Sequence, residues 1–280
     1  LNEEQFERSV DSCGATVERS LPGGFEIDRL YLAEYTDPIH PNTTEFGSLV
    51  FSRSIEVTRR TFTPALVAAL NRGCLYHMFQ GHANRALLTT EMAFSLQQYR
   101  DIDSLRTAIP FVFAGFGCHI SDFAIRNEFS TAVYIGGEGD CLSEQLLFKP
   151  GGGAISAYAS SAFEYLSENA AFAERLFANF FERPPVGAVS PLDEYTGAYW
   201  ILGEMIAKAE IEQMSQTFYG AEQILRYQLL GDPMLRVDPG PPLLRCEADW
   251  GGGFEPLGSS ALRARGGTND VTLRLTASDV

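Results

Sequence analysis

The stretch IPFVFAGFGCHISDF, residues Ile109 to Phe123, decides the fold of this chain. It runs for almost ten residues without a polar side chain, ends on Cys118 and then turns polar. An apolar run of this length, rich in Phe, Val and Ile, predicts a strand buried on both faces, as in the middle of a parallel sheet. Ligands bind beyond the carboxyl ends of such strands, so Cys118 is a candidate nucleophile. The alternative is a buried cysteine that only packs.

Two other short apolar runs predict neighbouring strands. CLYHMFQ (74–80) and AISAYAS (154–160) are each bounded by turn residues, and we expect both to be buried strands of the same sheet. FEIDRLYLAEY (25–35) alternates apolar and polar residues over its first half and is expected to be a strand as well. Residues 37–61 are expected to be irregular.

Helical segments lie between these strands. TPALVAALNRG (63–73) has a threonine cap at Thr63, a proline at the first helical position and a glycine at the end, which together predict a helix. Helical spacing also covers residues 3–19, 141–149, 161–182 and 194–213. Strands that alternate with helices predict an α/β fold with a mostly parallel central sheet flanked by helices.

The chain divides near residue 237. The segment YQLLGDPMLRV (227–237) is followed by DPGPP, which breaks the chain. Beyond it, LLRCEADW and VTLRLTA stand among glycine-rich turns and predict short strands. We therefore expect an α/β domain over residues 1–237, and a linker with a short all-β extension over 238–280.

Composition excludes several classes of protein. The formal net charge is −15, and nucleic acid is not the expected partner because phosphate binding needs a basic surface. No run approaches the roughly 18 apolar residues of a membrane span. The five cysteines, an odd number, have no CxxC spacing, so neither a complete disulfide framework nor a zinc ribbon is expected. They are Cys13, Cys74, Cys118, Cys141 and Cys246.

His82 is the candidate catalytic partner of Cys118. His82 directly follows the strand predicted at 74–80, and parallel strands place their carboxyl ends on one edge of a sheet. An imidazole beside a thiol stabilises the thiolate or protonates the leaving group. His119 follows the cysteine directly and is expected to point away from it, since neighbours on an extended chain face opposite sides. His77, inside an apolar run, is expected to be a hydrogen-bonded core residue.

Four segments together resemble a known family, the gingipain-like cysteine peptidases, which have a caspase-like fold. The segments are NRGCLYHMFQGHA, IPFVFAGFGCHISDF, CLSEQLLFKPGGGAISAYASS and YQLLGDPMLRV. The resemblance covers roughly residues 1–237 and implies peptide-bond hydrolysis, with a polypeptide as the substrate. It also implies Cys118 as nucleophile, His82 as general acid and base, and an oxyanion hole formed by the backbone N–H groups of Cys118 and Ala83. Ala83 stands where the family motif usually has a second glycine.

The same resemblance implies features around the dyad. SAYASSAF would offer a backbone edge to an extended substrate, with substrate-binding residues Ser160, Ser161, Ala162 and Phe163. Glu3 lies near the place of an acidic specificity residue, which gives a weak preference for cleavage after Arg or Lys. The family implies a secreted or cell-surface protein. No cofactor is expected, although calcium is possible by resemblance.

Other interpretations remain open from the sequence. One is a sortase-like transpeptidase that processes secreted proteins, and another is a catalytically idle caspase-like binding module, because fold does not fix function. The first strands of the fold and the acid that orients His82 are expected before Leu1. We therefore expect a companion N-terminal segment of the same precursor, which stays bound and completes the sheet.

Overall fold

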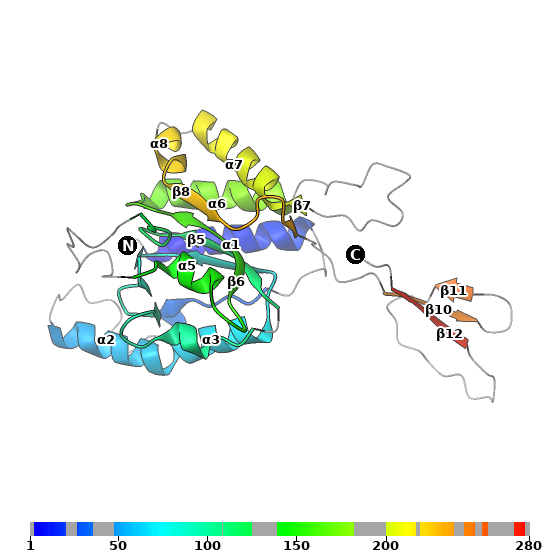
Figure 1. Ribbon diagram of the computed structural model, residues 1–280, viewed down its shortest axis with the longest axis horizontal. Coiled ribbons are helices and arrows are strands. Elements are labelled where there is room, and N and C mark those ends of the chain that lie inside the picture. The colour runs from blue at the N-terminus through cyan, green and yellow to red at the C-terminus, as the bar shows by residue number, and fades with distance from the viewer. Residues whose placement is uncertain are drawn as a thin grey trace.

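A four-stranded mixed sheet forms the centre of the molecule (Figure 1). This computed structural model describes residues 3–20, 27–35, 48–107, 109–124, 139–181, 200–216, 219–237, 244–249, 254–256 and 272–277. The strands are β1 (Tyr76–Gln80), β5 (Phe111–Phe116), β6 (Ala154–Ser160) and β8 (Tyr227–Leu230), in the order β1-β5-β6-β8. The pairs β1·β5 and β5·β6 are parallel, and β8 runs antiparallel to β6. This confirms the predicted α/β fold with a mostly parallel sheet.

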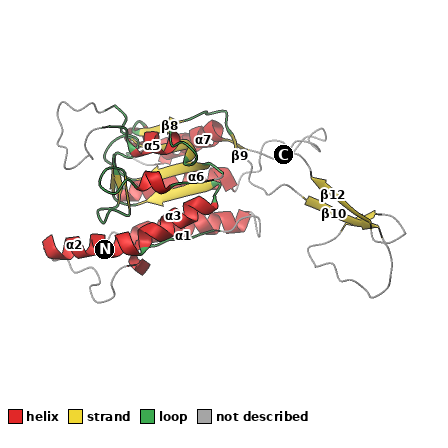
Figure 2. Ribbon diagram, turned by 60° about the horizontal axis from the view of Figure 1, so that its bottom comes forward, coloured by secondary structure: helices red, strands yellow, loops and turns green. Residues whose placement is uncertain are grey.

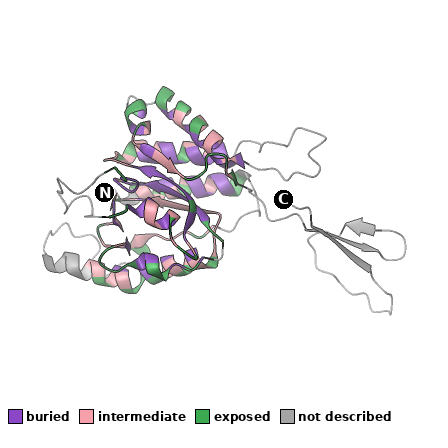
Figure 3. Cartoon of the chain, in the orientation of Figure 1, coloured by how far each residue is buried: buried purple, intermediate pink, exposed green. Residues whose placement is uncertain are grey.

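Helices cover both faces of this sheet (Figure 2). One core joins the sheet to α1 (Glu3–Ser20), α6 (Leu166–Phe181) and α7 (Leu202–Gln216). The other joins it to α3 (Phe62–Arg72) and α5 (Leu142–Leu147). The side chains of β5 alternate between these cores because successive residues of a strand point to opposite faces. Buried residues accordingly concentrate along the central strands (Figure 3).

Smaller elements complete the described chain. A short antiparallel sheet, β2-β3-β4, consists of β2 (Ala83–Asn84), β3 (Leu87–Leu88) and β4 (Phe94–Ser95). The remaining short helices are η2 (Asp101–Ser104) and α8 (Gly220–Ile224), and β7 (Trp200–Ile201) pairs with β9 (Arg236–Val237). A separate sheet joins β10 (Leu244–Asp249), β11 (Phe254–Pro256) and β12 (Thr272–Ala277). The division into domains at residue 237 stays a prediction.

Three local predictions are wrong. Residues 27–31 form neither helix nor strand, and the 3-10 helix η1 (Leu32–Tyr35) follows where a strand was expected. Within the stretch expected to be irregular, α2 (Ser48–Arg60) is a helix. Thr63 does not cap α3, which begins at Phe62, because its hydroxyl instead donates to the Ala93 carbonyl at 2.8 Å. Among the helices that the structure describes, none combines the length and apolar character that a membrane crossing requires.

Candidate active site

The register of β1 against β5 places His82 and Cys118 at the same level of the sheet. Gln80 and Phe116 are the last paired residues of the two strands, and the Gly81 N–H continues the ladder to the Phe116 carbonyl at 3.2 Å. His82 and Cys118 each come two residues after this last pair. Two parallel strands that end in step bring both residues to one edge, as the sequence predicted.

The loops that carry the two residues pack directly against each other. A Cβ atom added to Gly117 would lie 2.6 Å from the Gly81 carbonyl oxygen and 3.0 Å from the Ala83 Cβ. Such distances leave no room for any side chain at position 117, so glycine is required by close approach. The close approach joins the residue before Cys118 to Ala83, and Cys118 and Ala83 are the two proposed oxyanion donors.

The Cys118 sulfur lies against the backbone of Glu164. The Glu164 N–H donates to Sγ at 3.3 Å, and the thiol faces the Glu164 carbonyl oxygen at 3.9 Å. Burial raises the pKa of the Cys118 thiol, and the nearby Glu164 charge raises it further. The Glu164 N–H, the Arg226 charge and the N–H of Cys118 itself lower that pKa. These opposing effects leave a thiol that needs a base.

The other described cysteines are less suited to catalysis. Burial raises the pKa of Cys74 to about 11 and that of Cys141 to about 12, and it raises the pKa of Cys13 well above its usual range. Cys141 is fully buried at the start of α5, where its backbone N–H donates to the Glu144 carboxylate at 2.8 Å. These environments fit packing residues.

His82 is exposed and is held from two sides. Its ring meets the Phe6 ring of α1 edge-to-face, with centroids 5.4 Å apart, and its carbonyl oxygen accepts the Thr89 N–H at 2.8 Å. Among the residues that the structure describes, no carboxylate forms a hydrogen bond or ion pair with the imidazole. Phe6 was not foreseen as a partner, because a contact across 76 positions (82 − 6) leaves no pattern in the sequence.

Glu164 is a second residue that the sequence did not reveal. Its Oε1 accepts the Ser160 hydroxyl at 2.6 Å, and its Oε2 is buried without a hydrogen-bond partner in the described part of the chain. Burial raises the pKa of this carboxyl to about 7, although the Ser160 hydroxyl and the Arg226 charge lower it. The site therefore contains a carboxyl group that titrates near neutral pH beside the candidate nucleophile.

The two rival histidines are engaged elsewhere. His119 has a left-handed backbone, with φ of 57°, and its Nδ1 lies 2.9 Å from the Asp122 carboxylate. Its ring meets the Phe163 ring edge-to-face, with centroids 4.4 Å apart. His77 packs against the rings of Phe111 and Phe113, and burial lowers its pKa to about 4. His77 was expected to be a hydrogen-bonded core residue. Its Nδ1 is buried but has no hydrogen-bond partner among the described residues, so the expected hydrogen bond is absent at this atom.

The predicted substrate-binding segment has most of its backbone groups in use. The Ser160 carbonyl accepts the Ser121 N–H at 2.8 Å, the Ser161 N–H donates to the Arg226 carbonyl at 2.7 Å, and the Ala162 carbonyl accepts the His119 N–H at 2.9 Å. The segment is thus fastened to the loop that follows Cys118. Phe163 points its side chain outward and is exposed. Substrate binding here stays a prediction, with Phe163 as its most accessible member.

Two expected features have little support. Glu3 is the first residue of α1, and its side chain lies outside the described residues. No group of three or more metal-binding side chains occurs within the described ranges, and calcium binding stays a prediction.

A cysteine and a histidine that follow adjacent strand ends of a mostly parallel sheet are the residue types that a cysteine-nucleophile hydrolase uses. The sequence model of Peptidase family C25 matches residues 2–238, and the chain belongs to this family. This confirms the resemblance to gingipain-like cysteine peptidases and agrees with a caspase-like fold. None of the curated proteins compared matches the chain.

Solved structures with detectable similarity are distant. The complex of Porphyromonas gingivalis RgpB pro- and mature domains is 15% identical, with a TM-score of 0.48 over 67% of this chain and 39% of that chain. The Arg-specific cysteine proteinase gingipain R is 13% identical, with a TM-score of 0.48 over 86% of this chain and 55% of that chain. The chain thus spans about half, or less, of their length.

Proposed function

We propose that this protein is a cysteine endopeptidase that hydrolyses peptide bonds, with Cys118 as nucleophile and His82 as general acid and base. The observation that carries the proposal is the register of β1 against β5, which sets both residues two positions past the pair Gln80 and Phe116. Membership of a family of cysteine peptidases supports the reaction class.

The proposed reaction has two halves. The Cys118 sulfur attacks the carbonyl carbon of the scissile bond, and His82 takes the thiol proton and gives it to the leaving amine. The N–H groups of Cys118 and Ala83 stabilise the oxyanion of each tetrahedral intermediate. A water molecule, deprotonated by His82, then attacks the thioester, and the carboxylic acid product leaves as the Cys118 thiol is restored.

A thiol-directed peptide probe tests this proposal. The wild-type protein and Cys118→Ala are incubated with a labelled peptidyl ketone probe, and we expect labelling of the wild type only. Added glycine peptide separates the sortase-like alternative, because a transpeptidase joins the acyl group to that amine. A wild-type protein that is neither labelled nor able to cleave peptides, alone or co-expressed with the upstream region of its precursor, would be the idle binding module.

Thiol reactivity offers an independent test. We expect Cys118 to react with iodoacetamide faster than the other thiols near neutral pH. Burial raises the pKa of Cys74 to about 11 and that of Cys141 to about 12, whereas at Cys118 the Glu164 N–H and the Arg226 charge oppose the effect of burial. Peptide mapping after brief labelling identifies the first site. Faster labelling of Cys74 or Cys141 would contradict the assignment of the nucleophile.

Preference for Arg or Lys before the scissile bond forms a further part of the proposal. It needs a carboxylate near the dyad, and Glu3 lies one helical turn before Phe6, the residue of α1 that meets His82. Matched peptides with Arg, Lys or the uncharged citrulline at this position measure the preference. Glu3→Gln is expected to reduce the advantage of the charged peptides, and an unchanged advantage would exclude Glu3.

The free edge of β1 supports a companion segment. In the described sheet β1 is an edge strand, and a cavity of about 530 Å³ lies beside it, lined by α1, α3 and β1 itself. The Gln80 amide is buried there without a hydrogen-bond partner among the described residues. An open sheet edge attracts further strands. We propose that a companion N-terminal segment of the same precursor pairs with β1.

Co-expression tests the companion. Residues 1–280 are produced alone and together with the upstream region of the precursor, and hydrogen exchange of the β1 amides is measured in both. We expect stronger protection and higher activity in the co-expressed protein. A soluble, monomeric and fully active product from residues 1–280 alone would contradict the proposal.

Secretion or cell-surface location likewise rests on the family and stays a proposal.

A further inference from the structure

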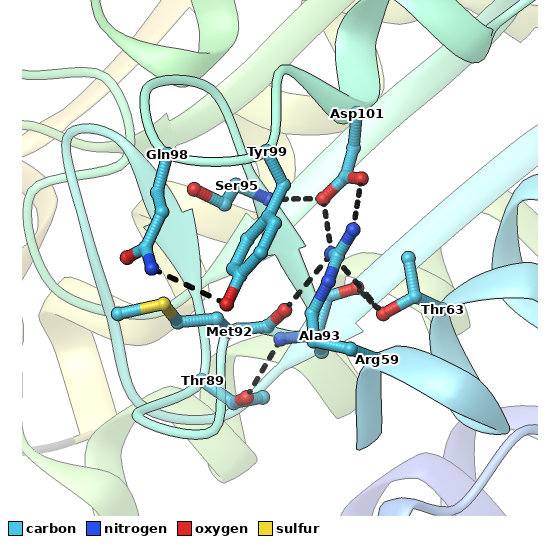
Figure 4. Close-up of polar contacts among 9 residues, drawn as sticks. All are labelled: Arg59, Thr63, Thr89, Met92, Ala93, Ser95, Gln98, Tyr99 and Asp101. Carbon is cyan, nitrogen blue, oxygen red and sulfur yellow. Dashed lines mark hydrogen bonds and ion pairs between the residues drawn. The ribbon is translucent and has the colours of Figure 1, made fainter. Parts of the chain in front are cut away.

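A buried ion pair lies behind the His82 loop. The Arg59 guanidinium of α2 binds the Asp101 carboxylate of η2 through two hydrogen bonds of 2.5 and 2.6 Å, and both side chains are largely buried (Figure 4). Asp101 also accepts the Ser95 N–H of β4 at 2.7 Å, and Arg59 donates to the Met92 carbonyl at 3.3 Å. The guanidinium carbon of Arg59 lies over the Tyr99 ring, 4.1 Å from the ring centroid.

The segment held by this pair has an unusual backbone. Thr89, Met92 and Arg100 have φ of 62°, 56° and 52°, in the left-handed region that residues other than glycine rarely adopt. Strained backbone of this kind persists only where surrounding contacts enforce it, and it gathers at functional sites. Within residues 89–101, Arg59 holds the Met92 carbonyl and Asp101 holds the Ser95 N–H.

The same segment reaches His82 through the short sheet β2-β3-β4. The Thr89 N–H donates to the His82 carbonyl at 2.8 Å, directly beyond the pairing of Ala83 with Leu88. The Thr89 hydroxyl oxygen accepts the Ala93 N–H at 3.3 Å, beside the turn that Arg59 holds. A continuous set of contacts therefore runs from the ion pair to the backbone of the candidate acid and base.

Stability alone is a poor explanation of the pair. A buried ion pair loses the hydration of both charges, and apolar residues of similar size often stabilise a fold as well or better. A bidentate pair does provide fixed geometry, because the planar guanidinium accepts one orientation of the carboxylate. His82 needs such a fixed geometry, because it is exposed and follows β1, an edge strand of the described sheet.

We propose that Arg59 and Asp101 are positioning residues for His82: they lock the strained segment 89–101, whose Thr89 holds the His82 backbone in place for proton transfer with Cys118. This inference rests on the proposed peptidase function. It assigns a role in the reaction to residues on α2 and η2 that do not touch the substrate. A displacement of about 1 Å at a reacting group can reduce the rate about a hundredfold.

Arg59→Lys is the main test, because it keeps the charge and removes the bidentate geometry. With an internally quenched peptide that contains one Arg, we expect kcat to fall about tenfold while KM changes by less than about twofold, since proton transfer and not binding is affected. Ile206→Val, in the other core, is the control. It lowers stability through packing, and its kcat should stay at the wild-type value.

Coupling to His82 separates positioning from general damage. In the His82→Ala background, Arg59→Lys should lower the residual rate by less than about twofold, because the group that it positions is gone. An equal loss in both backgrounds, or a wild-type kcat in Arg59→Lys, would overturn the proposal. If His82→Ala itself kept the wild-type kcat, the dyad and this proposal would both fail.

A second variant guards against misfolding of the ion-pair variants. Met92→Gly relaxes a left-handed position and leaves both charges in place, so the protein should fold at least as readily. A freer segment should still lower kcat, by about threefold, because the turn now samples other conformations. A Met92→Gly protein with wild-type kcat would contradict the claim that the locked turn matters.

Discussion

The two strands that precede the proposed dyad residues differ in how the protein holds them. Every residue of β5 is buried, and β5 pairs on both sides, with β1 and β6. In β1 four of the five residues are only half-buried, and in the described sheet it pairs on one side alone. Cys118 thus follows a strand fixed by the core, whereas the described contacts of His82 are the Phe6 ring and the Thr89 N–H. On our proposal, the nucleophile is positioned by core packing, and the histidine by these contacts and by the ion pair of Arg59 with Asp101.

The largest effect should come from removing the histidine. His82→Ala is expected to lower kcat/KM about a hundredfold to ten-thousandfold, the usual range for a general acid and base. His119→Ala is the control, since its ring is engaged by Asp122 and Phe163 and should cost little activity. Steady-state cleavage of a fluorogenic peptide measures both variants. Equal losses would instead place His119 in the mechanism.

A smaller effect is expected where the two loops meet. Gly117→Ala adds a Cβ at 2.6 Å from the Gly81 carbonyl, so the loops must separate. Overpacking of this kind costs about 1–3 kcal/mol of unfolding free energy, and the displaced dyad should lose about tenfold or more in kcat. Gly151→Ala is the control for a loss of stability without crowding: an added Cβ there meets no atom within 4 Å, but the φ of 70° strains an alanine, so stability should fall while kcat stays at the wild-type value. Urea unfolding and peptide cleavage are compared, and equal kcat values would contradict this reading.

On the Cys118 side, Glu164 should produce a pH dependence. Burial raises the pKa of this carboxyl to about 7, so its contribution to stability is full below its ordinary value near 4.5 and is lost as the pH rises to 7. Glu164→Gln should remove that part of the pH dependence and, because the Glu164 charge raises the Cys118 pKa, speed alkylation of Cys118. Glu56→Gln, at an exposed position of α2, is the control. Identical profiles in all three proteins would exclude the effect.

On the β1 side, His77 should produce an effect of the opposite sign, on stability and not on cleavage. Burial lowers its pKa to about 4, so stability is present above its ordinary value of 6.5 and is lost as the pH falls to 4. His77→Phe should flatten this acid limb and leave cleavage at pH 7.5 almost unchanged. Thermal unfolding between pH 4 and 7 measures it. Undiminished loss of stability in acid would show that another group is responsible.

The features that the sequence revealed are those with a local pattern. The strands β1, β5 and β6 could be predicted from the apolar composition of their segments. Gly73 follows the end of α3 as expected, with φ of 91°. Each of the strands β2, β3 and β4 is two residues long, too short for any periodicity. The helix α2 was not predicted, because the expectation of irregular structure covered all of residues 37–61.

Only those residues of the candidate site that follow a predicted strand could be predicted from the sequence. His82 and Cys118 followed from the rule that parallel strands end on one edge. Glu164 was missed because its high pKa comes from burial, which no residue pattern shows. Arg59 and Asp101 lie 42 positions apart, on elements that the sequence did not predict. Contacts between distant segments are set by the fold as a whole and leave no local pattern.

The equal spacing of His82 and Cys118 beyond the last strand pair also constrains how this gene can vary. Adding or deleting one codon between Phe116 and Cys118 would move Cys118 out of step with His82, because the β1·β5 register fixes both strand ends and Gly117 packs against the Gly81 carbonyl. The same change before His82 would displace the imidazole relative to Cys118. Substitutions can be absorbed at many positions around the site, but the number of residues in these two short segments cannot drift independently. Length, more than composition, is therefore the inherited quantity that should be best preserved here.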